Sequence, residues 1–493
     1  MPERATLGDQ RSEKSAEAVV VVARRRRAER EGELEAHGIG GVRPQMARQL
    51  ELAFEGRGEA PSVGRSVETP TAPRETEGSG ASGLLERVVS RPNMQAAYRR
   101  VRENKGSPGI DGLRVGDLPT WLRENWTRIR EELLAGTYRP TPVRRQMIPK
   151  PGGGERELGI PTVVDRLIQQ ALLQVLQPMF DPTFSDHSYG FRPGRRAHDA
   201  VRRAQGYVQA GRRWVVDVDL EKFFDRVNHD ILMGRLAKRI EDKRVLRLIR
   251  RYLEAGVMVN GVVVERHEGT PQGGPLSPLL ANVLLDEVDR ELEKRGHTFV
   301  RYADDGNVYV RSRRAGERVM ALLRRLYGRL RLRINESKSA VARVWDRKFL
   351  GFSFWVAQGQ KVRIRVADKA LVEMKARVRR LTRRICGQNL GKVAQVLRSY
   401  LLGWKSYFRL ADTPRVFREL DEWIRHRLRA IQLKQWKRGR TAYRELISRG
   451  ISPDLAARVA ANTCRWWKNA AMALHIALPN RWFDELGLPR LDA

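Results

Sequence analysis

Acidic residues follow two apolar segments of the sequence, a placement typical of metal-assisted chemistry. The segment RWVVDVDL (213–220) ends in acidic residues, and Asp304 and Asp305 follow the apolar run 298–302. Carboxylates buried together repel one another unless cations neutralise them, and hard cations such as Mg²⁺ prefer oxygen ligands. Three such carboxylates on two adjacent strands would suit two Mg²⁺ ions, with Mn²⁺ as a substitute. Two ions of this kind activate a 3′-hydroxyl and stabilise the leaving oxygen of an in-line displacement, as in polymerases and nucleases.

The spacing alone leaves the ligand in the first segment open. Asp217 and Asp219 are two residues apart and therefore share a face of the predicted strand. In the second segment, Asp-Asp before Gly306 is also common in ordinary turns, so YADD by itself leaves a structural interpretation open.

Strands and hairpins would have to position these residues. We expect a buried strand at 213–220 and a hairpin of two strands, 298–302 and 307–311, with the acidic residues at its tip. Asn260-Gly261 between two valine-rich runs predicts a second, tight hairpin. A basic hairpin is expected within RRQMIPKPGGGERELGIP (144–161), whose three glycines would form a flexible tip.

Helical spacing of apolar residues dominates elsewhere. We predict helices before the first strand (from Leu84), at 165–177 with Pro178 as its end, across 229–254, and from Pro278 to about Arg295. From 368 to about 473 the chain is helical in period and heavily basic, with Trp and Tyr among the Arg residues, which predicts a separate helical region.

The charge balance predicts a polyanionic partner. Lys and Arg number 94 against 58 Asp and Glu, giving a formal net charge of +36. Neutralising phosphates with release of counterions turns such an excess into affinity for nucleic acid. A basic protein of the membrane surface or the ribosome remains an alternative on charge alone.

Features that the sequence lacks limit the cellular compartment and the kind of metal site that we expect. It contains no run of about 18 apolar residues and no ordinary secretory signal, so we expect a cytoplasmic protein without a membrane partner. Cys386 and Cys464 are too few for a zinc site made of thiolates, which argues against a zinc endonuclease domain. Residues 1–83 are rich in charge, Gly, Ser and Pro and are expected to be disordered, and translation could begin at Met1 or Met46.

Eight blocks between about Leu84 and Leu488 resemble, in order, the reverse transcriptases encoded by group II introns. These blocks are NKGSPGIDG (104–112), IPKPGGGERELGIP (148–161), SYGFRPGR (188–195), DVDLEKFFDRVNHD (217–230), GTPQGGPLSPLLANVLLD (269–286), RYADD (301–305), LRINESKS (332–339) and FLGFSF (349–354). A ninth block, RSYLLGWKSYF (398–408), resembles the thumb and maturase region of the same family.

The resemblance implies an α+β right-hand polymerase. Residues 84–364 would form the fingers and a palm with an antiparallel sheet, and residues 365–493 an all-helical thumb and maturase domain. The implied activity is RNA-directed DNA polymerisation, which uses deoxynucleoside triphosphates (dNTPs), an RNA template and a DNA primer. The protein would also bind its group II intron RNA to assist splicing and retrohoming into target DNA.

The resemblance also assigns roles to single residues. It selects Asp219, with Asp304 and Asp305, as the metal ligands, because the family has an aromatic residue five positions after the first ligand. That residue is Phe224, which would exclude a 2′-hydroxyl by its bulk; a core Phe beside Phe223 is the structural alternative.

Further residues would bind the nucleotide. Lys150 and Arg156 would clamp the incoming triphosphate. Gln272 would contact the nucleotide or template, and Gly273 and Gly274 would permit close backbone approach there, although a simple turn is the alternative for this block. Lys338 would lie near the triphosphate, or be an ordinary exposed charge. RNA contact is assigned to the region 365–473 as a whole, because tryptophans on helices are more often core residues.

Two other functions fit parts of this pattern. One is a splicing cofactor that binds intron RNA and has lost polymerase activity; the complete set of aspartates, clamp residues and gate argues against it. The other is a domesticated reverse transcriptase that acts on another RNA, which the maturase-like tail disfavours. A gene lying inside a ribozyme would separate the intron maturase from the domesticated enzyme.

Overall fold

The computed structural model describes residues 83–149, 155–259, 262–264, 268–270, 272–383 and 387–492. Chain contacts divide the protein into one unit at 1–64 and a second at 65–493, and all described residues belong to the second. Predictions for 1–82, for Lys150 and the glycine tip, for the Asn260-Gly261 turn and for Cys386 therefore lie outside the described residues.

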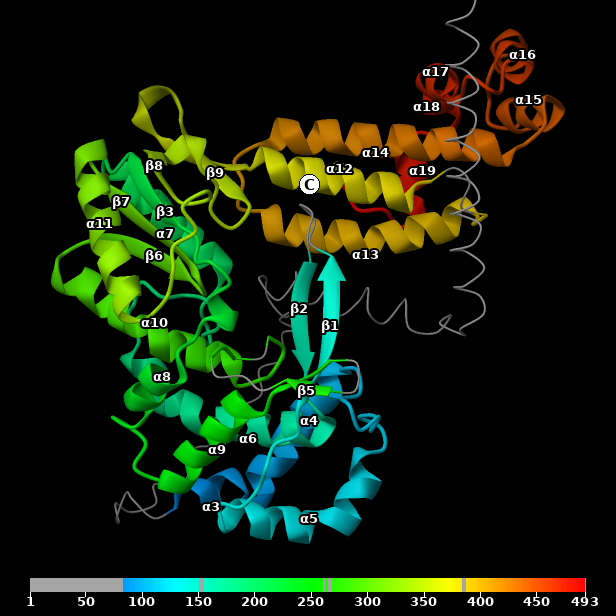
Figure 1. Ribbon diagram of the computed structural model, residues 1–493. Helices are drawn as coiled ribbons and strands as arrows, with labels where there is room; N and C mark the ends of the chain where they lie inside the picture. The colour runs from blue at the N-terminus through cyan, green and yellow to red at the C-terminus, as the bar shows by residue number, and fades with distance from the viewer. Residues whose placement is uncertain are drawn as a thin grey trace, which may run out of the picture. The chain divides into compact units, whose positions relative to one another are not determined.

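The helices and strands of the first part of the chain alternate, whereas the last part is helical (Figure 1). From residue 84 to residue 254 the elements are α3 (Leu84–Val88), α4 (Arg91–Asn104), α5 (Leu118–Leu134), β1 (Val143–Pro149), β2 (Glu155–Ile160), α6 (Val163–Phe180), α7 (Ala197–Gln209), β3 (Trp214–Val218), α8 (His229–Leu236) and α9 (Lys243–Glu254). From residue 257 to residue 366 they are β4 (Val257–Val259), β5 (Val262–Val264), α10 (Ser277–Lys294), β6 (Thr298–Tyr302), β7 (Asp305–Val310), α11 (Arg313–Arg329), β8 (Ala340–Arg343), β9 (Phe352–Val356) and β10 (Val362–Val366). The remaining elements are α12 (Asp368–Leu381), α13 (Leu390–Phe408), α14 (Pro414–Gln435), α15 (Gly439–Ile447), α16 (Pro453–Ala461), α17 (Trp466–Ala471), α18 (Leu474–Ala477) and α19 (Asn480–Glu485).

The predicted acidic strands belong to one antiparallel sheet with the order β6-β7-β3-β8. The pleat divides its side chains between two hydrophobic cores, since successive residues of a strand point to opposite faces. Val216 and Val308 join a core with the helices α10 and α11, whereas Val215 and Tyr309 join a second core with α7. The sheet is therefore buried on both faces and holds its end residues in a fixed position.

The basic hairpin also forms as predicted, and it belongs to a larger sheet. β1 and β2 pair antiparallel, and β1 then pairs in parallel with β4 to give the order β2-β1-β4-β5. This parallel pairing links residues more than 100 positions apart, such as Val143 and Val257, and local sequence patterns do not encode it.

Two helix boundaries differ from the sequence-based expectation. α6 continues through Pro178 and ends at Phe180, because burial of the Phe180 ring, which is 2% exposed, outweighs the one helix hydrogen bond that the proline nitrogen cannot donate. The predicted helix across 229–254 is two helices, and Asp242 caps the second by accepting a hydrogen bond from the Arg244 backbone N–H. Within the described residues, no helix is long and apolar enough to cross a membrane.

The C-terminal helices pack directly onto the sheet region. α12, α13 and α14 lie side by side (Figure 1). On α13 the Tyr407 hydroxyl donates to the Leu350 carbonyl oxygen at 2.9 Å, and the Tyr407 carbonyl oxygen lies 2.6 Å from His198 Nε2 on α7. Phe408 packs against Gly351, where an added Cβ would lie 3.3 Å from its ring. The second core thus continues across the predicted boundary at residues 364 and 365, which itself stays a prediction.

A close backbone contact fixes the tip of the β6–β7 hairpin. Ala303 has a left-handed backbone, with φ of 59°, and Gly190 lies against it. A Cβ at Gly190 would be 2.1 Å from the Ala303 nitrogen and 2.8 Å from the Tyr302 carbonyl carbon. Backbone atoms cannot rotate away as a side chain can, so only glycine fits at this position.

Gly190→Ala should therefore destabilise the protein by about 3 kcal/mol or more, because two backbone segments would have to separate. Thermal or urea unfolding of the full chain measures this loss. Gly206→Ala is the matched control, since it lies inside α7 with no atom within 4 Å of the added Cβ. We expect the control to be neutral or slightly stabilising. An unchanged melting temperature for Gly190→Ala would contradict the conclusion that only glycine fits against the Ala303 backbone.

Candidate active site

The register of β3 and β7 brings the two acidic segments together. Val218 pairs with Gly306, so Asp219 after β3 and Asp305 at the start of β7 lie at the same end of neighbouring strands. Asp304 lies in the two-residue turn between β6 and β7, because Tyr302 pairs with Asp305. The expected hairpin with acidic residues at its tip is thus present, with a shorter tip than the four residues predicted.

Asp217 and Asp219 have different environments. The Asp217 side chain is 14% exposed, and Arg347 forms an ion pair with it at 2.6 Å. Burial raises the pKa of Asp217, and the Arg347 guanidinium opposes that shift. The Asp219 side chain is 44% exposed, and Lys338 Nζ lies 3.3 Å from its Oδ2. A guanidinium thus neutralises the more buried Asp217, and a lysine lies beside the more exposed Asp219. The choice of Asp219 as the ligand stays a prediction.

The LRINESKS segment forms hydrogen bonds with the backbone on both sides of Asp219. The Asn335 N–H donates to the Asp219 carbonyl oxygen at 2.8 Å, and the Asp219 N–H donates to the Ser339 hydroxyl at 3.0 Å. Arg347 Nη2 donates to the carbonyl oxygen of Lys338, so the same guanidinium contacts Asp217 and holds the segment that carries Lys338. Sequence reasoning missed Arg347, whose only local signal is one more cation in a basic chain.

Phe224 lies at the edge of the first core. Its neighbour Phe223 is 3% exposed, while Phe224 is half-buried with its ring 5.1 Å from that of Phe223 in a T-shaped arrangement. Phe223 therefore fills the core position, and part of the Phe224 ring remains accessible. The Phe224 carbonyl oxygen accepts the Thr270 N–H at 2.7 Å, which ties it to the segment that carries Gln272.

Gln272 and Gly273 contact the basic hairpin. The Gly159 N–H of β2 donates to the Gln272 carbonyl oxygen at 2.9 Å. Gly273 has φ of 128°, and a Cβ there would lie 2.8 Å from the Gly159 carbonyl oxygen. The predicted close backbone approach is thus made to β2. Arg156 is exposed, three residues before Gly159 on the same strand, and its role toward a nucleotide stays a prediction.

The carboxylates fit a divalent cation in donor type. They supply hard oxygen atoms from two neighbouring strand ends, and the ammonium group of Lys338 already lies against Asp219. Among the described residues, no group of three or more His, Cys, Asp or Glu side chains is arranged closely enough to hold an ion. The assignment of Asp219, Asp304 and Asp305 as metal ligands therefore stays a prediction.

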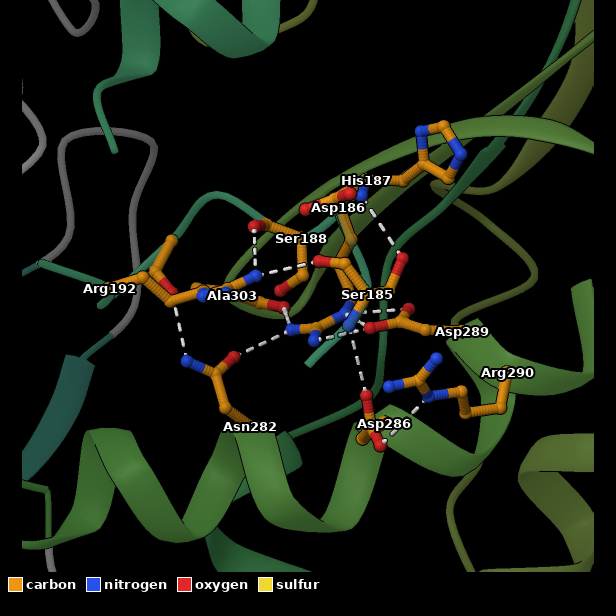
Figure 2. Close-up of polar contacts among 12 residues, drawn as sticks. Ser185, Asp186, His187, Ser188, Arg192, Asn282, Asp286, Asp289, Arg290 and Ala303 are labelled. Carbon is orange, nitrogen blue, oxygen red and sulfur yellow. Dashed lines mark hydrogen bonds and ion pairs between the residues drawn. The ribbon is translucent and has the colours of Figure 1, made fainter. Parts of the chain in front are cut away.

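A buried arginine beneath the acidic turn is the second residue that sequence reasoning missed. Arg301 on β6 is 2% exposed and forms an ion pair with Asp289 of α10 at 2.6 Å. Figure 2 shows Asn282, Asp289 and the Ala303 backbone gathered in the polar cluster to which it belongs. The detectable signal was a charged residue inside the otherwise apolar strand TFVRY.

The helical region combines buried aromatic residues with exposed cations. Trp404 and Trp436 are buried at 8% and 7% exposure, as expected for packing residues, whereas Trp467 is 49% exposed. Arg379 and Arg427 lie over the Trp423 ring at 5.6 and 5.4 Å. On α12 the exposed basic side chains are Lys369, Lys375, Arg379 and Arg380.

Comparisons with known proteins match two parts of the chain. Residues 148–354 match the family model "Reverse transcriptase (RNA-dependent DNA polymerase)", and residues 371–449 match "Group II intron, maturase-specific domain". Protein YkfC of Escherichia coli is 38% identical over 218 residues, which is 43% of this chain and 57% of that protein. The group II intron-encoded protein LtrA of Lactococcus lactis is 38% identical over 208 residues, which is 42% of this chain and 34% of LtrA.

A third relative also comes from an intron. An uncharacterized 91 kDa protein in the cob intron of Schizosaccharomyces pombe is 34% identical over 206 residues, 42% of this chain and 25% of that protein. The chain thus spans at most 57% of the length of these three relatives.

The matched segments coincide with the sheet region and the basic helices. Residues 148–354 belong to the reverse transcriptase family and residues 371–449 to the group II intron maturase family, which together identify the chain by family as a group II intron reverse transcriptase/maturase.

Proposed function

We propose that this protein is an RNA-directed DNA polymerase that also binds its group II intron RNA and assists splicing and retrohoming. The reaction adds dNTPs to the 3′ end of a DNA primer on an RNA template and releases pyrophosphate. The observation that carries the proposal is the β3–β7 register, which brings Asp219 and Asp305 to one end of the sheet, with Lys338 beside Asp219. The family match supports the same reaction class.

The acidic residues would hold the cations of the reaction. Two Mg²⁺ ions on Asp219, Asp304 and Asp305, with Mn²⁺ as a substitute, would activate the primer 3′-hydroxyl and stabilise the leaving oxygen. Lys338 lies 3.3 Å from Asp219, so a small side-chain movement would let its ammonium bind a triphosphate oxygen. Arg156 and Lys150 on the basic hairpin would clamp the same triphosphate.

The contacts between loops explain how a nucleotide site could be shaped. Two backbone hydrogen bonds join these parts of the chain. The Thr270 N–H donates to the Phe224 carbonyl oxygen, and the Gly159 N–H of β2 donates to the Gln272 carbonyl oxygen. One wall of the site would thus connect the gate to the triphosphate clamp. The accessible part of the Phe224 ring would contact the sugar and exclude a 2′-hydroxyl.

The basic helices would bind intron RNA. The exposed cations of α12 lie within or just before the segment that matches the maturase-specific domain. RNA affinity that rests on such cations depends on counterion release and therefore falls with salt. Target DNA would be recruited in the same complex during retrohoming.

Primer extension on an RNA template with Mg²⁺ and dNTPs tests the polymerase. We expect extension by the wild type and a loss of about 10³-fold or more in Asp304→Ala, since a metal-ligating carboxylate supplies several kcal/mol of transition-state stabilisation. Asp219→Asn should behave in the same way. Asp217→Asn is the matched control and should retain extension, because Arg347 already occupies that carboxylate. A folded, RNA-binding wild type that extends no primer would instead indicate a splicing cofactor.

Substitution of the gate should change sugar selection. We expect Phe224→Val to raise ribonucleotide incorporation relative to deoxyribonucleotide by about 10- to 100-fold, because the smaller side chain leaves room for a 2′-hydroxyl. The ratio of kcat/KM for the two nucleotides measures the effect. Phe223→Leu is the control, since that ring is buried, and it should reduce stability without changing the ratio. Equal selectivity in Phe224→Val and the wild type would argue for a purely structural Phe224.

Removal of positive side chains from α12 should weaken the binding of intron RNA. The affinity of the variant should also depend less on salt concentration. The double variant Lys375→Ala, Arg379→Ala is expected to reduce the slope of log affinity against log salt by about one to two, as two phosphate contacts are lost. Arg313→Ala with Arg318→Ala on α11 removes the same charge from another exposed helix and is the control. Equal slopes for the two double variants would place the RNA elsewhere.

A further inference from the structure

A polar cluster around Arg301 lies next to the acidic turn. The guanidinium of Arg301 makes more hydrogen bonds than are needed to neutralise its own charge. Arg301 is three residues before Asp304 on β6 and is 2% exposed. A charge removed from water must be paired, and Asp289 does this through contacts of 2.6 to 2.9 Å with Nε and Nη2. The remaining nitrogen, Nη1, is therefore available for a different role.

Nη1 of Arg301 reaches the acidic turn itself. It donates to the Ala303 carbonyl oxygen at 2.8 Å and to the Asn282 Oδ1 at 2.9 Å. Ala303 immediately precedes Asp304 and has a left-handed backbone, with φ of 59°. A residue other than glycine adopts this conformation at a cost of about 1–2 kcal/mol, so neighbouring contacts must maintain it.

The opposite side of the turn is held by the SYGFRPGR segment. The Tyr189 N–H donates to the Arg301 carbonyl oxygen at 2.8 Å, and the Arg301 N–H donates to the His187 carbonyl oxygen at 2.9 Å. Gly190 then lies against Ala303 with no room for a side chain. The turn is thus enclosed between the guanidinium of Arg301 and the backbone of residue 190.

Asn282 connects the two sides of this enclosure. Its Oδ1 accepts from Arg301 Nη1, and its Nδ2 donates to the Gly190 carbonyl oxygen at 2.9 Å (Figure 2). The side chain is 1% exposed and comes from α10. A helix, a strand and a loop therefore share one set of hydrogen bonds that ends on the peptide group joining Ala303 to Asp304.

We propose that Arg301 is a positioning residue for the polymerase reaction: it holds the Ala303 carbonyl and so sets the direction of the Asp304 and Asp305 carboxylates. This inference rests on the proposed function, because it concerns how the predicted metal ligands are oriented. Loss of the guanidinium fork lets the Ala303 peptide rotate, which scatters the two carboxylates and weakens cation binding. A residue that served only to stabilise the fold would leave cation binding unchanged in the folded variant.

Arg301→Lys is the test variant, with Arg425→Lys as its matched control. Lysine keeps the positive charge beside Asp289 but cannot reach Asp289, Asn282 and Ala303 together, since it lacks the planar fork. Arg425 on α14 is also buried, at 2% exposure. It forms ion pairs with Asp421 at 2.8 Å and with Asp484 at 3.1 Å, both in the C-terminal helical region.

Two readouts are measured on each full-length protein. Mn²⁺ binding is followed by electron paramagnetic resonance without substrate, and primer extension is titrated with Mg²⁺. Arg301→Lys should raise the half-saturating concentration of both ions by about tenfold, the effect of losing a charge-assisted hydrogen bond. Arg425→Lys should lower the melting temperature to a similar degree and leave both concentrations within about twofold of the wild type.

A second variant keeps the test decisive if Arg301→Lys does not fold. Asn282→Ala leaves the ion pair with Asp289 intact and removes one partner of Nη1, so a rise of about threefold in both concentrations is expected. Folded variants that are less stable but bind Mn²⁺ like the wild type would overturn the inference. A wild type that binds Mn²⁺ but extends no primer would instead overturn the proposed function, while Mn²⁺ binding by the variants would still test the role of Arg301.

Discussion

Antiparallel pairing of β3 with β7 brings carboxylates from distant parts of the chain to one end of a sheet, and the rest of the site depends on how their repulsion is balanced. Asp217 and Asp219 are separated from Asp304 and Asp305 by more than 80 residues in sequence, yet the register places them at the same end of the sheet. Like charges gathered at one end of a sheet destabilise a fold unless cations accompany them. The protein provides a different cation for each of the first two carboxylates, Arg347 at Asp217 and Lys338 at Asp219, whereas Arg301 is paired with Asp289 and contacts the backbone of the turn.

These cations differ in mobility, and the difference is informative. Arg347 is joined to two partners and Arg301 is fully enclosed, so neither guanidinium can leave its position without breaking several hydrogen bonds. Lys338 is 66% exposed at its side chain and forms one ion pair at 3.3 Å. An exposed pair of this kind contributes little to stability. A lysine that can move away from Asp219 is consistent with a site that exchanges cations and phosphates during a reaction.

Contacts between sequence blocks that are far apart join the sheet region and the basic helices into one packed structure. The FLGFSF and GWKSYF blocks lie about 50 residues apart in sequence and meet through Tyr407 and Leu350, and through Phe408 and Gly351. The second hydrophobic core therefore includes side chains from α7, from the acidic sheet and from the basic helices. Through this shared core, the basic helices pack against the sheet that carries the aspartates.

The sequence by itself determined the elements with strong local signals. The apolar strands, the β1–β2 and β6–β7 hairpins and the basic helices follow from residue periodicity and turn residues, which depend only on near neighbours. The ordered blocks also identified the family and singled out Asp219, Asp304 and Asp305. Only the tertiary structure decided which element pairs with which, as in the parallel contact of β1 with β4. It also decided the partners of Asp217 and Arg301, since burial and ion pairing depend on residues that are distant in sequence and leave no local pattern.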